Sequence, residues 1–268
     1  MDNLLKELLD PVDPKVFFKQ YWGKRHLVLR RNKLKNLFNW NDFEQYMNEF
    51  PKVPNLQIIG WDDKTWGTTE SHVYEKWCLD KVKKGKLKLP MLTKTQVHDA
   101  WKAGKSVVIP FAEYRKEILM NVCKTFERYF AKGQVNVYAS PGKGSKSFPA
   151  HADNTENFLF HTEGRVKWRI FKEFAPDKPK EILEEFILEA GDLLYIPQFQ
   201  YHEVIPVGAR ILCSIHFPNK PKQSLKNFKI SKNSKREPWY KWQPEKYDAN
   251  GHLNTEDFPY KWRDSKKW

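Results

Sequence analysis

The sequence is poor in cysteine and has no long run of apolar residues. Its three cysteines, Cys78, Cys123 and Cys213, are odd in number and widely spaced, so they predict neither a disulfide framework nor a clustered zinc site. We expect reduced, mostly buried thiols. No stretch reaches membrane-spanning length, and the first residues lack the basic and apolar pattern of a secretory signal. These absences predict a cytoplasmic protein with no membrane partner.

Acidic residues are also fewer than basic residues. The chain of 268 residues has 33 Asp and Glu against 47 Lys and Arg, a formal net charge of +14. Such an excess attracts anionic partners, for example RNA, a ribosome or an acidic protein surface. It is equally compatible with a basic protein that binds none of these. Both interpretations stay open on the charge alone.

Apolar and aromatic residues are plentiful and follow regular patterns. Apolar spacing predicts helices at residues 2–9, from 13 onward, 40–50, 97–101 and 114–130. It predicts strands at 26–30, 55–66, 72–77, 106–109, 135–139, 186–188, 193–196 and 210–216. Short strands separated by glycine and proline, with no helical period between them, indicate a β-sandwich or barrel in the second half.

The chain divides into three parts by composition. We expect N-terminal helices and strands over residues 1–115, packed on a barrel formed by residues 116–218. Residues 219–268 form a basic extension with 13 Lys and Arg, 6 Asp and Glu and four tryptophans. Basic and aromatic residues in alternation can contact phosphates and stack on RNA bases. The same rings can instead fasten the extension to the barrel.

Three residues form a candidate metal site. His151 and Asp153 are two positions apart, so in a strand they point to the same side, and His202 comes from a strand 51 residues later. Two histidines and one carboxylate, with three positions left open, are the ligands of non-heme Fe(II) oxygenases. A zinc hydrolase is disfavoured because no positioned base is evident. His161 and His216, among apolar neighbours, are predicted to be hydrogen-bonded core residues.

The motifs around this site resemble the JmjC-type branch of the cupin superfamily, which are 2-oxoglutarate oxygenases. The similarity is to ribosomal-protein oxygenases and to the asparaginyl hydroxylase of hypoxia-inducible factor, over roughly residues 12 to 218. It rests on Pro149-Ala150-His151-x-Asp153, Asn157-Phe158, Gly164, Trp168, Gly191-Asp192-x-Leu194-Tyr195-Ile196-Pro197 and His202. The resemblance implies a mainly β fold with helical additions, a double-stranded β-helix (jelly-roll or cupin barrel) with the metal at its mouth.

The resemblance also implies the chemistry. His151, Asp153 and His202 would hold Fe(II), with 2-oxoglutarate as cosubstrate and O2 as oxidant, and no further catalytic residue is predicted. The expected activity is a dioxygenase that hydroxylates a protein side chain, with a ribosomal substrate implied by resemblance only. Demethylation would be the same hydroxylation of an N-methyl carbon. The target residue and the oligomeric state are not predicted.

The cosubstrate residues depart from the family pattern. Val166 stands where a Lys or Arg is usual after the turn glycine, and Phe148 where a Thr is common. Lys167 is adjacent but is expected to face the other way, because strand side chains alternate. Arg210, eight residues after His202, is the predicted substitute, since its planar fork suits a carboxylate.

Two further family positions, Tyr138 and Asn157, match residues that line the cosubstrate pocket. Arg210 could alternatively be an exposed strand residue, and Asn157 could cap a turn. Two other functions also stay open for the chain. One is hydroxylation of an RNA base, as in a tRNA, because the chain is strongly basic. The other is a catalytically silent cupin that binds RNA or protein, in view of Val166 and Phe148.

Overall fold

The computed structural model describes residues 3–30, 36–49, 52–53, 57–59, 92–110, 112–127, 133–142, 144–145, 147–175 and 177–218. The helices are α1 (Asn3–Leu9), α2 (Pro14–Gln20), α3 (Trp40–Glu49), α5 (Lys94–Lys102), α6 (Glu117–Glu127) and the short η1 (Ala112–Tyr114). The strands are β1 (Leu27–Leu29), β2 (Lys52–Val53), β3 (Gln57–Ile59), β4 (Leu92–Thr93), β5 (Ser106–Ile109), β6 (Gln134–Ser140), β7 (Thr155–Phe174), β8 (Ile182–Glu189), β9 (Leu193–Ile196) and β10 (Gln200–Pro218). Among these helices, none has the length and apolar character that crossing a bilayer requires.

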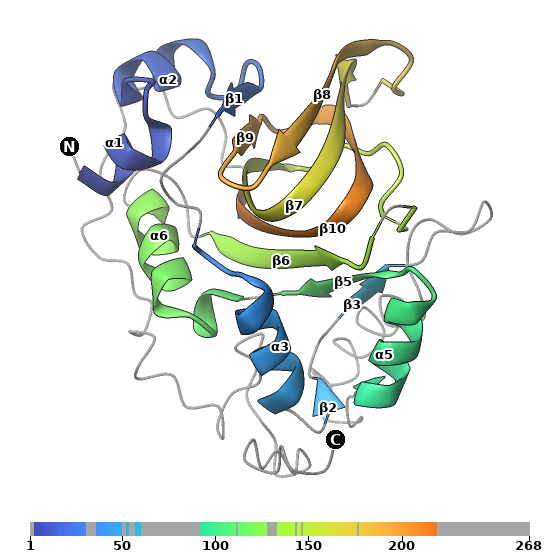
Figure 1. Cartoon of the computed structure of the whole chain (residues 1–268). Helices are drawn as coiled ribbons and strands as arrows, with labels where there is room; N and C mark the ends of the chain where they lie inside the picture. Colours follow the sequence, from blue (N-terminus) through green and yellow to red (C-terminus); the bar gives the residue numbers. More distant parts are fainter. Residues whose placement is uncertain are drawn as a thin grey trace, which may run out of the picture.

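One antiparallel sheet contains most of the strands. Its order is β1-β9-β7-β10-β6-β5-β3, and β8 pairs with β7 beside this path. The two longest strands, β7 with 20 residues and β10 with 19, pair with each other along their length. The first part of β7 also pairs with β9 and its second part with β8. The sheet therefore curls round on itself, as Figure 1 shows, and the predicted barrel is confirmed.

The bend in the long strands depends on Gly164. Its φ is +74°, and a Cβ atom there would lie 1.8 Å from the carbonyl oxygen of Ala209 on β10. Opposite it, β10 has an irregularity between Pro206 and Arg210. The sequence predicts a turn at this glycine between two strands. The structure instead continues one strand through a sharp bend, because the hydrogen-bonded ladder resumes on both sides.

Alternation along the strands separates two apolar cores. On β10, Ile211, Cys213 and Ile215 belong to the core outside the barrel, while Leu212 belongs to the core inside it. On β6, Val137 faces outward in the same way. The inner core contains Leu159, Val166, Trp168, Ile170, Leu188, Leu194, Ile196, Val204 and Leu212. The polar residues that alternate with the outer core therefore point into the barrel.

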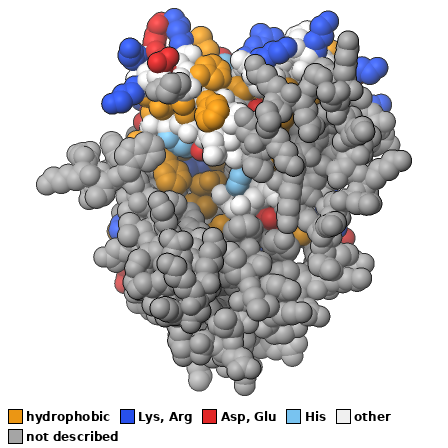
Figure 2. Space-filling view, turned by 180° about the vertical axis from the view of Figure 1, so that it is seen from behind, with side chains coloured by type: hydrophobic (Ala, Val, Ile, Leu, Met, Phe, Trp, Pro, Cys, Tyr) orange, Lys and Arg blue, Asp and Glu red, His pale blue; other side chains and the backbone are white. Residues whose placement is uncertain are grey.

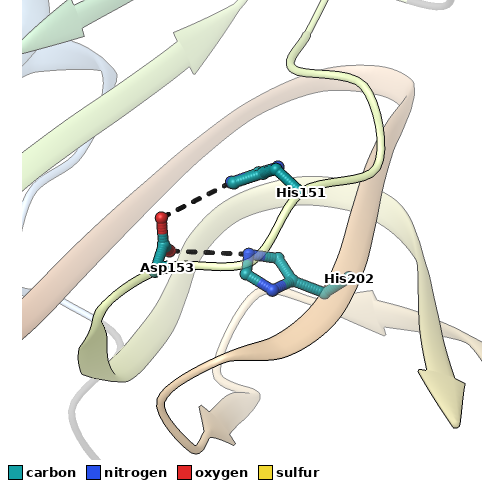
Figure 3. A group of neighbouring side chains, drawn as sticks. All are labelled: His151, Asp153 and His202. Carbon is teal, nitrogen blue, oxygen red and sulfur yellow. Dashed lines mark ion pairs between the residues drawn. The ribbon is translucent and has the colours of Figure 1, made fainter. Parts of the chain in front are cut away.

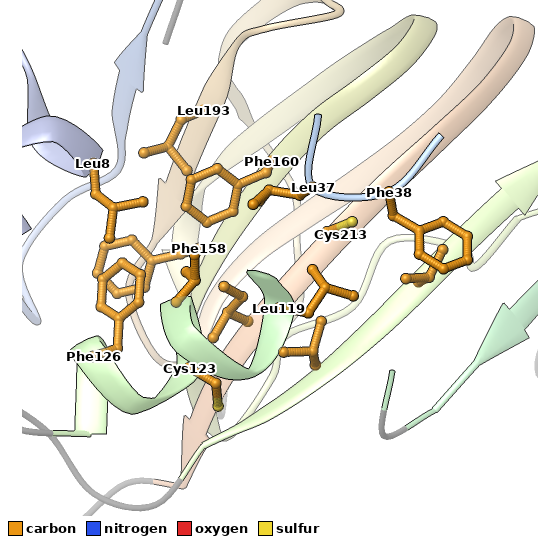
Figure 4. Close-up of a cluster of buried hydrophobic side chains, with 14 of the residues drawn as sticks. Leu8, Leu37, Phe38, Leu119, Cys123, Phe126, Phe158, Phe160, Leu193 and Cys213 are labelled. Carbon is orange, nitrogen blue, oxygen red and sulfur yellow. The ribbon is translucent and has the colours of Figure 1, made fainter. Parts of the chain in front are cut away.

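The outer core lies between the sheet and the N-terminal helices. Helix α6 contributes Leu119, Cys123 and Phe126, which are all fully buried and recur at the helical spacing of three to four residues. They pack with Phe158 of β7 and with Leu8 of α1, as Figure 4 shows. The helices therefore pack against the outer face of the sheet. The inner face of the same strands carries the candidate site residues.

Most of the predicted elements are present where the described residues allow a comparison. Helices α1, α2, α3, α5 and α6 and strands β1, β5 and β6 match their predicted positions to within a few residues. Of the predicted hairpin over 55–66 and 72–77, the described residues include only β3, which pairs with β5. Residues 72–77, Cys78 and the extension 219–268 lie outside the described residues. The three-part division at 115 and 218 stays a prediction.

Candidate metal centre

The three predicted ligands meet at one end of the barrel. One ligand atom from each of His151, Asp153 and His202 lies within 4.8 Å of the others. Nε2 of His151 is 3.8 Å from Oδ1 of Asp153, and Nε2 of His202 is 3.6 Å from Oδ2, as Figure 3 shows. His202 comes from β10, whereas His151 forms only an isolated bridge with it and Asp153 lies outside any strand. The expectation of a regular strand at His151 and Asp153 is therefore wrong.

Backbone carbonyl groups orient both imidazoles. Nδ1 of His151 lies 2.8 Å from the carbonyl oxygen of Pro149, and Nδ1 of His202 lies 3.0 Å from that of Gln200. A carbonyl can only accept, so Nδ1 of each ring donates to it and Nε2 is the nitrogen directed at the carboxylate. Burial, with a contribution from His151, lowers the pKa of His202 to about 4. Both rings thus point a neutral donor nitrogen at the carboxylate, as metal ligands require.

The carboxylate is ionised and held in place. Burial opposes its charge, but the imidazoles of His202 and His151 and the amide of Asn157 outweigh this and keep the pKa of Asp153 below its ordinary value. Nδ2 of Asn157 donates to Oδ2 of Asp153 at 2.8 Å. The donor set, two neutral imidazoles and one carboxylate on one side, fits a divalent transition metal with open positions opposite.

The site opens toward solvent on one side. The side chain of His202 is 4% exposed, that of His151 17% and that of Asp153 40%. Figure 2 shows histidine surface (pale blue) beside a hollow bordered by hydrophobic side chains (orange). The ring of Phe148 lies 5.5 Å from that of His151. A substrate group can therefore approach the ligands from the barrel mouth.

Arg210 lies inside the barrel, and not on its surface. It is 1% exposed, and its Nε donates to Oγ of Ser140 at 3.1 Å. Oγ of Ser140 in turn lies 2.8 Å from Oγ of Ser106. Nη1 of Arg210 is buried and has no hydrogen-bond partner within the described part of the chain. Burial lowers the pKa of Arg210 to about 10, so the guanidinium is still charged at neutral pH.

Tyr138 lies on the same inner surface. It is on β6 opposite Leu212, two residues along the ladder from the pair of Arg210 and Ser140. Burial raises the pKa of Tyr138 to about 12, and both Asp153 and Arg210 act on it electrostatically. Its phenol is therefore a neutral hydroxyl that lies within electrostatic reach of the carboxylate ligand and of the buried guanidinium.

Lys167 lies outside the barrel. Its neighbours on β7, Val166 and Trp168, are buried in the inner core, and Lys167 points the other way. Its Nζ forms an ion pair with Glu185 of β8 at 3.0 Å. We therefore leave Lys167 out of the candidate site. Alternation already favoured this orientation, and Val166 places an apolar side chain on the inner face.

The comparisons with known proteins agree with this architecture. Residues 107–225 match the JmjC domain family. This segment is therefore similar to JmjC domains. Ribosomal oxygenase YcfD from Escherichia coli, solved with cobalt and 2-oxoglutarate, superposes with a TM-score of 0.53 at 18% identity over 80% of this chain and 53% of that one. At this identity the match supports the fold alone.

Curated relatives resemble the chain over three quarters of its length. The "bifunctional lysine-specific demethylase and histidyl-hydroxylase NO66" of Dictyostelium discoideum is 26% identical over 76% of this chain and 40% of its own length. "Ribosomal oxygenase 1" of Danio rerio is 25% identical over 75% of this chain and 38% of its own. The chain thus spans about two fifths of the length of these relatives.

Proposed function

We propose that the chain is an Fe(II)- and 2-oxoglutarate-dependent oxygenase that hydroxylates a protein side chain. The observation that carries this is the convergence of His151, Asp153 and His202 at the mouth of the barrel. The same barrel contains the buried Arg210, whose Nη1 has no hydrogen-bond partner among the described residues. Fe(II), when bound there, would use O2 to oxidise 2-oxoglutarate to succinate and CO2 and to place the second oxygen atom on a substrate carbon.

The residues of the chain would bind and orient these groups. The two Nε2 atoms and the carboxylate would hold the metal on one face, and Asn157 would keep the carboxylate in position. Arg210 would bind the distal carboxylate of 2-oxoglutarate through Nη1, which has no partner among the described residues, and Tyr138 would line the path between the metal and Arg210. The apolar inner core would exclude water from the reaction.

A protein substrate, in particular a ribosomal protein, is suggested by the names of the relatives, which include a histidyl-hydroxylase and a ribosomal oxygenase. The net charge of +14 would also favour approach to the anionic ribosome. We extend the proposal to a cytoplasmic location, where the buried thiols of Cys123 and Cys213 would stay reduced. RNA contact through residues 219–268 stays a prediction.

The first test is an anaerobic titration with Fe(II) and then 2-oxoglutarate, followed by the visible charge-transfer band of the chelated complex. We expect a saturable band in the wild-type chain and none in Asp153→Ala. Iron binding without the band would replace the proposal with a metal-binding cupin of another kind. Absence of iron binding would favour a catalytically silent binding module.

The second test identifies the substrate class. Ribosomes, their separated proteins and total tRNA would be incubated with the Fe(II)-loaded chain, 2-oxoglutarate and O2, and each product analysed by mass spectrometry. We expect one added oxygen atom on a protein and stoichiometric succinate. An oxygen atom on a nucleoside would instead assign the chain as an RNA base hydroxylase.

A further inference from the structure

Two buried N–H donors inside the barrel have no partner among the described residues. They are Nη1 of Arg210 on β10 and Nδ1 of His161 on β7. Each residue is 1% exposed. An unpaired buried donor costs about 1–3 kcal/mol, so folded proteins rarely keep one without a bound ligand or water to satisfy it. Two such donors on adjacent strands of the inner face indicate a shared acceptor.

Trp168 fixes which nitrogen of His161 carries the proton. The indole Nε1 of Trp168 donates to Nε2 of His161 at 3.0 Å, with the two rings nearly perpendicular at 88°. An indole N–H can only donate, so Nε2 must be the unprotonated nitrogen and Nδ1 must carry the hydrogen. Burial, followed by the charge of Arg210, holds the pKa of His161 well below its ordinary value, so the ring stays neutral.

The strand register brings His161 and Arg210 to the same region of the inner face. Leu212 of β10 pairs with His161 on one side and with Tyr138 on the other. Arg210 precedes Leu212 by two residues and faces the same side of β10, and its charge acts on the rings of both His161 and Tyr138. A carboxylate beside Leu212 would therefore have the imidazole, the guanidinium and the phenol around it.

The position of the imidazole is fixed before any ligand arrives. The backbone N–H of His161 donates to the carbonyl of Asp192 at 2.9 Å, and the N–H of Gly191 donates to the carbonyl of His161 at 2.7 Å. With Trp168 holding Nε2, the ring is restrained at both ends. Restraint of this kind lowers the entropy lost on binding.

Arg210 cannot bind a carboxylate side-on, through Nε and one Nη together. Its Nε already donates to Ser140 at 3.1 Å. Nη1, which has no partner among the described residues, can bind one carboxylate oxygen, and a donor from a neighbouring strand can then bind the second oxygen. His161 supplies a neutral one, so the total charge of the pocket stays +1 against a carboxylate of −1.

We propose that Nδ1–H of His161 is a second donor to the distal carboxylate of the 2-oxo acid, and that His161 and Arg210 together select a dicarboxylate cosubstrate. This inference rests on the proposed use of 2-oxoglutarate. It assigns His161 a binding role, whereas its sequence context predicts only a hydrogen-bonded core residue. Trp168 is then a positioning residue that acts through the imidazole.

The test compares two ligands on the Zn(II)-loaded chain, which cannot turn over. 2-Oxoglutarate and 2-oxopentanoate share the 2-oxo acid group and chain length, but the second has a methyl group in place of the distal carboxylate. By calorimetry, His161→Phe should bind 2-oxoglutarate about 10- to 100-fold more weakly, as expected for a lost hydrogen bond to a charged group. Its affinity for 2-oxopentanoate should change less than about twofold.

His161→Gln is the matched control, because an amide can accept from Trp168 and still donate to a carboxylate. It should recover most of the 2-oxoglutarate affinity. Equal affinity of His161→Phe and wild type for 2-oxoglutarate would overturn the inference while leaving the proposed function intact. An equal loss for both ligands would assign His161 a structural role only. If the wild-type chain bound no 2-oxoglutarate, the proposed function itself would fail.

A second measurement uses only the wild-type chain, so it does not depend on whether a variant folds. In the ¹⁵N-labelled, Zn(II)-loaded wild-type chain, the imidazole spectrum of His161 should show a proton on Nδ1 and a bare Nε2. Saturating 2-oxoglutarate should move the Nδ1 proton resonance downfield, and 2-oxopentanoate should not. A proton on Nε2, or identical shifts with both ligands, would contradict the inference.

Discussion

The side-chain amide of Asn157 donates a hydrogen bond of 2.8 Å to Oδ2 of Asp153. The orientation of this amide is itself set, because its Oδ1 accepts from Oγ1 of Thr155 at 3.2 Å. Asn157 is 3% exposed, at the beginning of β7, and thus ties the carboxylate ligand to the barrel wall. The relationship explains how Asp153 can be positioned although it lies outside any strand.

Replacing Asp153 by Ala should abolish retention of Fe(II) and turnover. The carboxylate is the only anionic member of the site, and its side chain is 40% exposed, so its loss should leave the fold largely intact. Equilibrium dialysis followed by metal analysis measures the effect, with the exposed Asp177→Ala as the control. Unchanged turnover in Asp153→Ala would remove the assignment of the metal ligands.

Replacing Asn157 by Ala should weaken metal binding by about 10- to 100-fold, the usual effect of removing a group that orients a ligand. Thr155→Val is the matched control, because it removes only the hydrogen bond to Oδ1 of Asn157 and leaves the bond from Nδ2 to Asp153 in place. Its effect on metal affinity should be much smaller. Wild-type affinity in Asn157→Ala would mean that the amide only caps the start of the strand.

Replacing Arg210 by Met should weaken 2-oxoglutarate binding by about 100-fold, because a charged hydrogen-bond donor to the distal carboxylate is lost. Lys167→Met is the matched control, since Lys167 pairs with Glu185 outside the barrel and should have little effect. The charge-transfer band of the Fe(II) complex reports both affinities. Equal losses, or the reverse order, would show that Arg210 does not bind the cosubstrate.

Gly164→Ala should lower the free energy of unfolding by more than about 3 kcal/mol, because both the backbone angle and the space forbid a side chain. Gly104→Ala separates the two causes, since Gly104 has a φ of +76° but no atom within 4 Å of the added Cβ. It should lose about 1–2 kcal/mol. Urea denaturation measures both, and similar losses would disprove the close approach of Gly164 to Ala209.

Stability should depend on pH through Glu156, which is 6% exposed. Burial raises its pKa above 4.5, although the hydroxyl of Tyr195 donates to it and partly offsets the shift. The folded state therefore holds the proton more tightly than the unfolded state. The stabilisation from Glu156 is fully present below the pKa that this group has in the unfolded state. It is lost as pH rises through the pKa that the group has in the folded state. Urea denaturation across this interval should show a fall that Glu156→Gln abolishes.

The candidate metal ligands could be chosen from sequence because His151, Asp153 and His202 stand within motifs that resemble JmjC oxygenases, whereas their spacing alone is a weak signal. The structure brings one ligand atom from each of them within 4.8 Å of the others. Alternation along a strand likewise predicts that Lys167 and Val166 point to opposite sides, and the structure agrees. This alternation depends on spacing, which the chain carries directly.

The hydrogen-bond partners of Arg210 inside the barrel could not be predicted from the sequence. The engagement of Arg210 with Ser140, and of Ser140 with Ser106, depends on the register of three strands. The polar alternation of Asn136, Tyr138 and Ser140 on β6 was a signal for an inner face, but spacing does not say which partner lies opposite.

The sequence by itself indicated a barrel, because short strands recur between glycine and proline, and its resemblance to a known family indicated the candidate ligand residues. Only the tertiary structure decided that Trp168 donates to His161 and that Nη1 of Arg210 has no hydrogen-bond partner among the residues that the structure describes. A hydrogen bond across a sheet requires both the register and the direction of each side chain. Long-range pairing fixes those two quantities, and no local pattern contains them.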